Sequence, residues 1–198
     1  VGPDSVGYRL TEKALVFGGD TLTATDIAVK HYDLDIGDKS LLNKLDDSTV
    51  KNAKQEITRL LEEAVSGMQS ILLSPKGKKI LQTLTRDTGS FMITSESDQW
   101  SSILVLLLEE VLFRAEAKDE WICDLQIITE LTESGITANI QYSKVNTDEI
   151  ELEIEIKAVT LHELAFAFVP SGTLLPSKWP EVPSFEGPGW YCDVVFDI

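Results

Sequence analysis

The side chains best suited to chemistry lie at the end of the sequence, where Asp197 is followed by Ile198. A strand that runs to the terminus would hold Asp197 in a fixed position, with the terminal carboxylate of Ile198 one residue away. Two oxygen donors at one place suit a hard divalent cation such as Ca²⁺ or Mg²⁺. Asp197 and Ile198 are therefore candidate metal ligands. The competing interpretation is a pair of ordinary, solvent-exposed carboxylates at a strand end.

Other kinds of chemistry have little support in the sequence. The two histidines, His31 and His162, are far apart, and neither belongs to a Ser-His-Asp or Cys-His motif. Carboxylates are so abundant that any pair of them is weak evidence for acid-base catalysis. The run GGDT at residues 18–21 lacks the lysine and the full glycine spacing of a phosphate-binding loop, so it indicates a turn.

Two predicted strands must position the terminal residues. Apolar residues alternate with charged ones over residues 150–158, and with polar or acidic ones over residues 190–198. This period of two is typical of strands with one face on a core and the other in water. Lys157 lies at the end of the first strand, where its simplest role is to balance the charge of three preceding glutamates. Residues 164–169 continue this strand across a bulge at residues 162–163.

The loop between these two strands is rich in proline. Residues 170–188 contain five of the seven prolines in the chain. Proline cannot donate a hydrogen bond to a neighbouring strand, so this segment is excluded from the interior of a sheet.

The rest of the chain supplies helices and further strands. Apolar residues recur at helical spacing after Ser48, up to residue 68, and again over residues 98–117, where Ser97 or Asp98 would cap the helix. Between these helices, residues 74–79 (SPKGKK) indicate a break with a solvated basic turn. Strands are predicted at residues 91–94, 121–129 and 136–142. These patterns predict an α+β fold, in which a mostly antiparallel sheet packs on long amphipathic helices.

Composition limits the class of partner. The formal net charge of −16 argues against direct nucleic-acid binding, because a phosphate-binding surface needs clustered lysine and arginine. Cys123 and Cys192 lack further ligands for a zinc site, and they are expected to be reduced core residues. No signal peptide or membrane-spanning run is evident, so no membrane association is expected. The expected location is the cytoplasm, with the nucleus as the alternative.

Three motifs resemble the archease family, whose members assist the RNA-splicing tRNA ligase. They are the run KAVT at residues 157–160, the terminus VFDI at residues 195–198, and the helix at residues 95–113. The resemblance spans residues 90–198 and implies an accessory protein, not an enzyme, which promotes guanylylation and repeated turnover of the ligase. Lys157 matches the position of a lysine important in that family, which implies a role in cofactor binding.

The same resemblance implies a metal site between two aspartates. The family holds a divalent cation between its terminal aspartate, here Asp197, and an aspartate in an N-terminal His-Thr-Ala-Asp motif. The nearest match is TATD at residues 23–26, which lacks the histidine and makes Asp26 the candidate second ligand. The implied ion is Ca²⁺, with Mg²⁺ or Mn²⁺ as alternatives.

A second resemblance concerns the first third of the chain. The runs LVFGGDTLTATDIAV at residues 15–29 and DIGD at residues 35–38 are similar to a segment of the hydantoinase A/oxoprolinase family. The chain is therefore divided into a hydantoinase-like segment, residues 1–73, and an archease-like domain, residues 74–198. The alternative functions are a fragment of an ATP-dependent hydantoinase or oxoprolinase, or a fused reading frame in which neither part is active.

Overall fold

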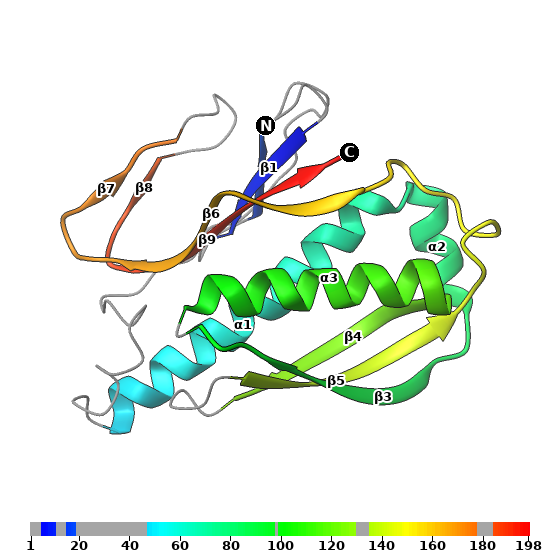
Figure 1. Cartoon of the computed structure of the whole chain (residues 1–198), viewed down its shortest axis with the longest axis horizontal. Helices are drawn as coiled ribbons and strands as arrows, with labels where there is room; N and C mark the ends of the chain where they lie inside the picture. Colours follow the sequence, from blue (N-terminus) through cyan, green and yellow to red (C-terminus); the bar gives the residue numbers. More distant parts are fainter. Residues whose placement is uncertain (1–4, 11–14, 19–46, 98, 130–134, 178–183) are drawn as a thin grey trace.

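The fold places two long helices between two antiparallel sheets (Figure 1). The computed structural model describes residues 5–10, 15–18, 47–97, 99–129, 135–177 and 184–198. The first sheet has the order β2 (Leu15–Gly18), β1 (Ser5–Leu10), β9 (Gly189–Asp197) and β6 (Ala158–Val169). The second has the order β3 (Asp87–Thr94), β5 (Gly135–Lys144) and β4 (Glu120–Ile128). The α+β class is confirmed, although the single predicted sheet is in fact two.

The helices explain why there are two sheets. The long helices are α1 (Asp47–Leu72) and α3 (Trp100–Lys118), and the short α2 (Pro75–Thr83) follows α1. A helix with apolar residues around most of its circumference must be covered on more than one side. In α3, Leu104, Leu107 and Leu108 are fully buried, and the buried residues Val105 and Leu112 widen this face to more than half of the circumference. One sheet could cover only one side, so the second sheet covers the other.

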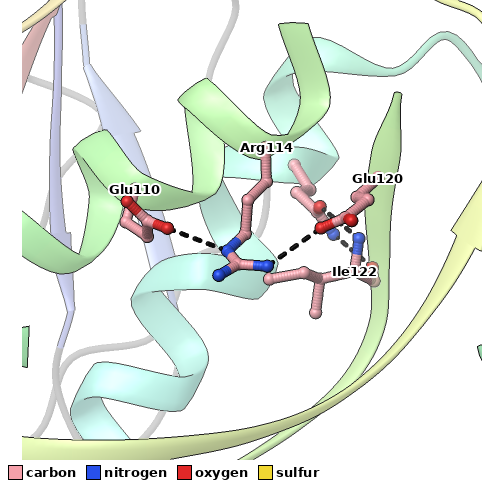
Figure 2. A network of polar contacts seen from close by, with 5 residues as sticks. Glu110, Arg114, Glu120 and Ile122 are labelled. Carbon is pink, nitrogen blue, oxygen red and sulfur yellow. Dashed lines mark hydrogen bonds and ion pairs between the residues drawn. The ribbon is translucent and has the colours of Figure 1, made fainter. Parts of the chain in front are cut away.

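Polar contacts tie α3 to the three-stranded sheet. The guanidinium of Arg114 donates hydrogen bonds of 2.9 Å to the carboxylates of Glu110 and Glu120, and Figure 2 shows Arg114 between these two residues. The central carbon (Cζ) of the same guanidinium lies 4.4 Å from the centre of the Phe91 ring in β3. The helix ends at Lys118, and its C-cap residue, Asp119, has a left-handed backbone with φ 58°. Its N-cap is Gln99, which makes no side-chain cap bond, so the predicted cap at Ser97 was wrong; Asp98 lies outside the described residues.

Helix α2 corrects the predicted turn at residues 74–79. Ser74 is its N-cap and accepts a hydrogen bond of 3.0 Å from the backbone N–H of Gly77, while Pro75 occupies the first turn. Serine followed by proline is a helix-start signal as well as a turn signal. A Cβ at Gly77 would overlap the carbonyl oxygen of Glu151, so this helix packs closely on the segment that precedes β6. The predicted basic turn is therefore the first part of a helix.

The strand predicted over residues 150–158 is largely absent. The expected alternation of burial is present up to residue 156, since Ile150 and Ile156 are buried and the intervening glutamates are exposed, but it fails at the end, where Ala158 is exposed and Val159 is buried. The backbone, however, bonds to the end of α1: the N–H of Glu153 donates to the carbonyl of Leu72 at 2.7 Å. Among the described residues, this segment forms one isolated bridge, between Leu73 and Leu152, and the ladder begins at Ala158. A period of two thus identified an extended segment whose partner is not a strand.

The strands predicted at residues 121–129, 136–142 and 91–94 are confirmed as β4, β5 and a longer β3. The bulge in β6 is confirmed as well, with a register shift between Thr160 and Ala165 and a positive φ of 53° at Glu163. The proline-rich segment forms no interior strand but does contain a small hairpin, β7 (Leu174–Leu175) paired with β8 (Phe185–Glu186).

The predicted division at residue 73 falls between α1 and α2. Apolar residues of α1, including Ile57, Leu60 and Met68, belong to the same buried cluster as residues of α3 and β9. Helix α1 is therefore part of the core that supports the rest of the chain. None of the helices in the described residues is both long and apolar enough to cross a membrane.

Candidate functional site

The candidate site lies where β9 ends beside the start of β6. Residue 158 pairs with Asp197 in the β6–β9 ladder, which places Lys157 next to the last two residues. The backbone N–H of Lys157 donates to the carbonyl of Asp197 at 2.8 Å, and its Nζ donates to the main-chain oxygen of Ile198 at 3.1 Å. The structure therefore brings three of the four residues selected from the sequence into one place.

Strand β9 is well suited to hold this end rigidly. It pairs with β6 on one side and with β1 on the other, where Ser5 lies opposite Asp197. Its inward side chains Trp190, Cys192 and Phe196 are almost fully buried. Trp190 also packs its ring 6.0 Å from that of Phe166 in β6. A central strand anchored by large buried side chains gives Asp197 little freedom of main-chain movement.

The opposite face of β9 carries the polar groups. Asp193 and Asp197 alternate with the buried residues and are partly exposed, as is Ile198. Across the ladder, Asp197 faces Ala158 and Val195 faces Thr160, so small side chains surround the aspartate on the β6 side. Asp197 is thus partly exposed, and its partner across the β6 ladder is a small residue.

The oxygen atoms of Asp197 and Ile198 at the end of β9 provide some, but not all, of the ligands that a hard cation needs. A carboxylate and a main-chain oxygen are ligands that Ca²⁺ and Mg²⁺ prefer, but Ca²⁺ needs about six to eight oxygens. Within the described residues no cluster of three or more histidine, cysteine or acidic side chains could hold a metal. Asp26, the candidate second aspartate, lies outside the described residues. The positively charged Nζ of Lys157 already contacts the Ile198 oxygen. A bound cation would have to displace this ammonium group or share the oxygen with it.

A second feature, not predicted from the sequence, is a groove of about 540 Å³ between α1, α2 and β4. Glu62, Gln69, Lys78 and Asp124 are among its lining residues. Burial raises the pKa of Glu62 above its ordinary value, and the nearby Asp124 and Glu63 raise it further, although a hydrogen bond from Ile127 opposes this. No local pattern could have revealed the groove, because its wall in β4 is distant in sequence from its wall in α1, as the hydrogen bond from Gln69 to Ile122, 53 residues apart, shows.

Comparison with known proteins assigns a family to this arrangement. Residues 44–198 match the model of the Archease protein family (MTH1598/TM1083). The match covers every element from α1 to β9, including Lys157 and the terminal Asp197 and Ile198. It begins within residues 1–73, the segment predicted to be hydantoinase-like, and includes all of α1. No curated protein sequence matches the chain. The chain therefore belongs to the archease family.

Proposed function

We propose that this protein assists the RNA-splicing tRNA ligase, promoting its guanylylation and its repeated turnover. The observation that carries the proposal is the contact of Lys157 with Asp197 and Ile198, in a chain that belongs to the archease family. The resemblance singled out Lys157, Asp197 and Ile198. Lys157 is about forty residues from the other two in sequence, yet it is hydrogen-bonded to both. A rigid strand end with a carboxylate, a lysine and a main-chain oxygen suits a role in positioning a charged group of the partner.

The proposed role includes a divalent cation, Ca²⁺ in the first place and Mg²⁺ or Mn²⁺ as alternatives. The Asp197 carboxylate and the main-chain oxygen of Ile198 would be two of its ligands, and Asp26 is the proposed third. When bound, the cation would add positive charge where phosphate groups of a nucleotide could be received. Lys157 would hold Ile198 in place through its hydrogen bond and would add a second positive charge to the same end.

The proposal makes the protein a helper that acts through protein contact. Its net charge of −16 repels the phosphate backbone of RNA, whereas it favours association with a ligase that must itself carry positive charge to hold RNA. The protein alone is not expected to open hydantoin or 5-oxoproline rings.

The test measures formation of the guanylylated ligase from GTP, with and without this protein. The parent should accelerate the reaction, and both Asp197→Asn and Lys157→Met should lose most of that acceleration. Asp193→Asn, which removes a carboxylate from the same face of β9, is the matched control and should act like the parent. Failure of the parent to change the rate, or equal activity of Asp197→Asn and parent, would refute the proposed role of this site.

A further inference from the structure

In the two larger sheets, the structure describes three edge strands with their side chains, and these edges differ in how they are protected. A strand at the edge of a sheet presents unpaired N–H and C=O groups that can bind another chain, and proteins usually block such edges. The edges are formed by β4 and β3 in the three-stranded sheet and by β6 in the other sheet. Two of them are blocked, each by a different device.

The edge of β4 is blocked by side chains from α1. The Gln69 amide accepts from the N–H of Ile122 at 3.1 Å and donates to its carbonyl at 2.6 Å, so it forms the pair of bonds that a neighbouring strand would form. Five residues further on, Glu62 accepts from the N–H of Ile127 at 2.9 Å. Gln69 is itself almost completely buried, which makes this a permanent part of the fold. A second strand could add here only by displacing both side chains.

The edge of β6 is interrupted. Its ladder with β9 shifts register between Thr160 and Ala165, and Glu163 within this bulge has a positive φ of 53°. A bulge bends the strand and breaks the regular row of edge groups, which prevents continuous pairing with another chain.

The edge of β3 has no such protection. Its eight residues pair one for one with β5, from Asp87 opposite Tyr142 to Thr94 opposite Gly135, without any register shift. Within the described residues, no hydrogen bond from another element reaches the outer edge of β3. Residues 88–94 (TGSFMIT) contain no charged residue and no proline. The strand also presents Met92, which is 71% exposed.

We propose that the open edge of β3 binds an extended segment of the protein partner, which adds as a further strand to the three-stranded sheet. This inference rests on the proposed function, so the partner is the RNA-splicing ligase. A row of unpaired backbone groups on a strand without a bulge is complementary to another extended backbone, and the exposed Met92 offers an apolar contact to a side chain of the added strand. Charge favours the ligase over a second copy of this chain, because two copies would each carry −16, whereas an RNA-holding protein is basic.

The test uses two exposed residues that flank opposite edges of the same sheet. Met92 in β3 and Ile128 in β4 both lie opposite Thr137 of the central strand, and both are exposed, at 71% and 47%. A lysine at either position adds the same charge to the same face of the sheet. Met92→Lys should weaken binding of the purified ligase, measured by calorimetry, by roughly tenfold or more, whereas Ile128→Lys should change it less than about twofold. Thr88→Lys, at the other end of β3, is a second variant that should also weaken binding.

Each other outcome identifies a different contact. Unchanged binding in both β3 variants would overturn the proposal, and equal weakening by Met92→Lys and Ile128→Lys would place the contact on the open face of the sheet instead. A parent dimer in light scattering that Met92→Lys converts to a monomer would assign the edge to a second copy. If the edge variants weaken binding but Asp197→Asn still promotes guanylylation, the β3 contact stands and the proposed role of Asp197 fails. If the parent protein does not bind the ligase at all, both the β3 contact and the proposed role of Asp197 are refuted.

Discussion

Arg114 on α3 donates a hydrogen bond of 2.9 Å to Glu120 at the start of β4, and both side chains are only 13% exposed (Figure 2). The ion pair thus joins the C-terminal part of the central helix to an edge strand. Because the guanidinium also bonds Glu110 and packs on Phe91, one side chain connects α3 to both outer strands of the three-stranded sheet.

Removing this arginine should destabilise the protein strongly. Arg114→Gln leaves two poorly solvated carboxylates without their cation, and breaking such a pair costs on the order of 3 kcal/mol in the free energy of unfolding. Arg59→Gln is the control, since its pair with Glu63 is also between residues four apart but its side chain is 58% exposed. That substitution should cost less than about 1 kcal/mol. Urea denaturation measures the free energy of unfolding of both variants. Similar small decreases in the two variants would show that the Arg114 network adds no stability.

Core packing of α3 gives a second matched pair. Leu107 is fully buried between the sheets, whereas Leu106, the adjacent residue, is 36% exposed. Leu107→Ala should lower the free energy of unfolding by about 2 to 5 kcal/mol, because it leaves a cavity that the two sheets cannot fill. Leu106→Ala should cost less than about 1 kcal/mol. Equal effects in denaturant melts would contradict the placement of α3 between two sheets.

The sequence was sufficient for elements whose pattern and partners are local. The buried positions of α3 and the antiparallel strands β4 and β5 follow from residue spacing and were predicted with small errors at their ends. It was insufficient where one pattern fits two structures. Ser74-Pro75 can open a turn or a helix, and only the packing of Gly77 against Glu151 selects the helix. Alternation correctly identified the buried side of residues 150–156, although not of Ala158, which is exposed, and it contains no information on what the backbone pairs with.

The candidate site shows the same limit. Lys157, Asp197 and Ile198 could be selected from motifs, but their contact depends on the register of β6 with β9. The protection of β4 by Gln69 joins residues 53 positions apart and has no local signature. Whether Asp26 joins the site stays a prediction, as does the hydantoinase-like character of residues 1–73.

The groove carboxylate Glu62 should make stability depend on pH. Since burial raises its pKa in the folded state above the unfolded value, the folded protein binds the proton more tightly. Its contribution to stability is therefore fully present at low pH, and it is lost as pH rises from the ordinary carboxyl pKa through the raised folded value. Glu62→Gln keeps an acceptor for the Ile127 N–H but cannot ionise.

This substitution should remove part of the pH dependence. The free energy of unfolding, measured in urea between about pH 4 and pH 7, should fall less with rising pH in Glu62→Gln than in the parent. Glu109→Gln, at an exposed position of α3, should follow the parent profile. A steeper fall in Glu62→Gln than in the parent would reverse the sign of the argument and exclude burial as the dominant influence on this group.

The last prediction concerns cation binding at the end of β9. Asp197→Asn keeps nearly the same shape but removes one formal negative charge from a site where few oxygen donors are available, so affinity for Ca²⁺ should fall sharply. Residues added after Ile198 should have a similar effect, because they convert its carboxylate into an amide. Asp193→Asn, which faces Ala165 and not Ala158 across the ladder, should change binding little.

Calorimetric titration with Ca²⁺ measures these affinities directly, and thermal unfolding gives an independent readout. A ligand that binds only the folded state stabilises it by RT ln(1 + [L]/Kd), so Ca²⁺ should raise the Tm of the parent and of Asp193→Asn but not that of Asp197→Asn.

Lys157→Met separates two roles of the lysine, since its Nζ competes with a cation for the Ile198 oxygen while also holding that residue in place. Tighter Ca²⁺ binding in Lys157→Met would mean that competition dominates, and weaker binding would mean that positioning does. Unchanged Ca²⁺ affinity in Asp197→Asn would place the ion elsewhere on the protein, and no binding by the parent would leave Asp197 without a metal-binding role.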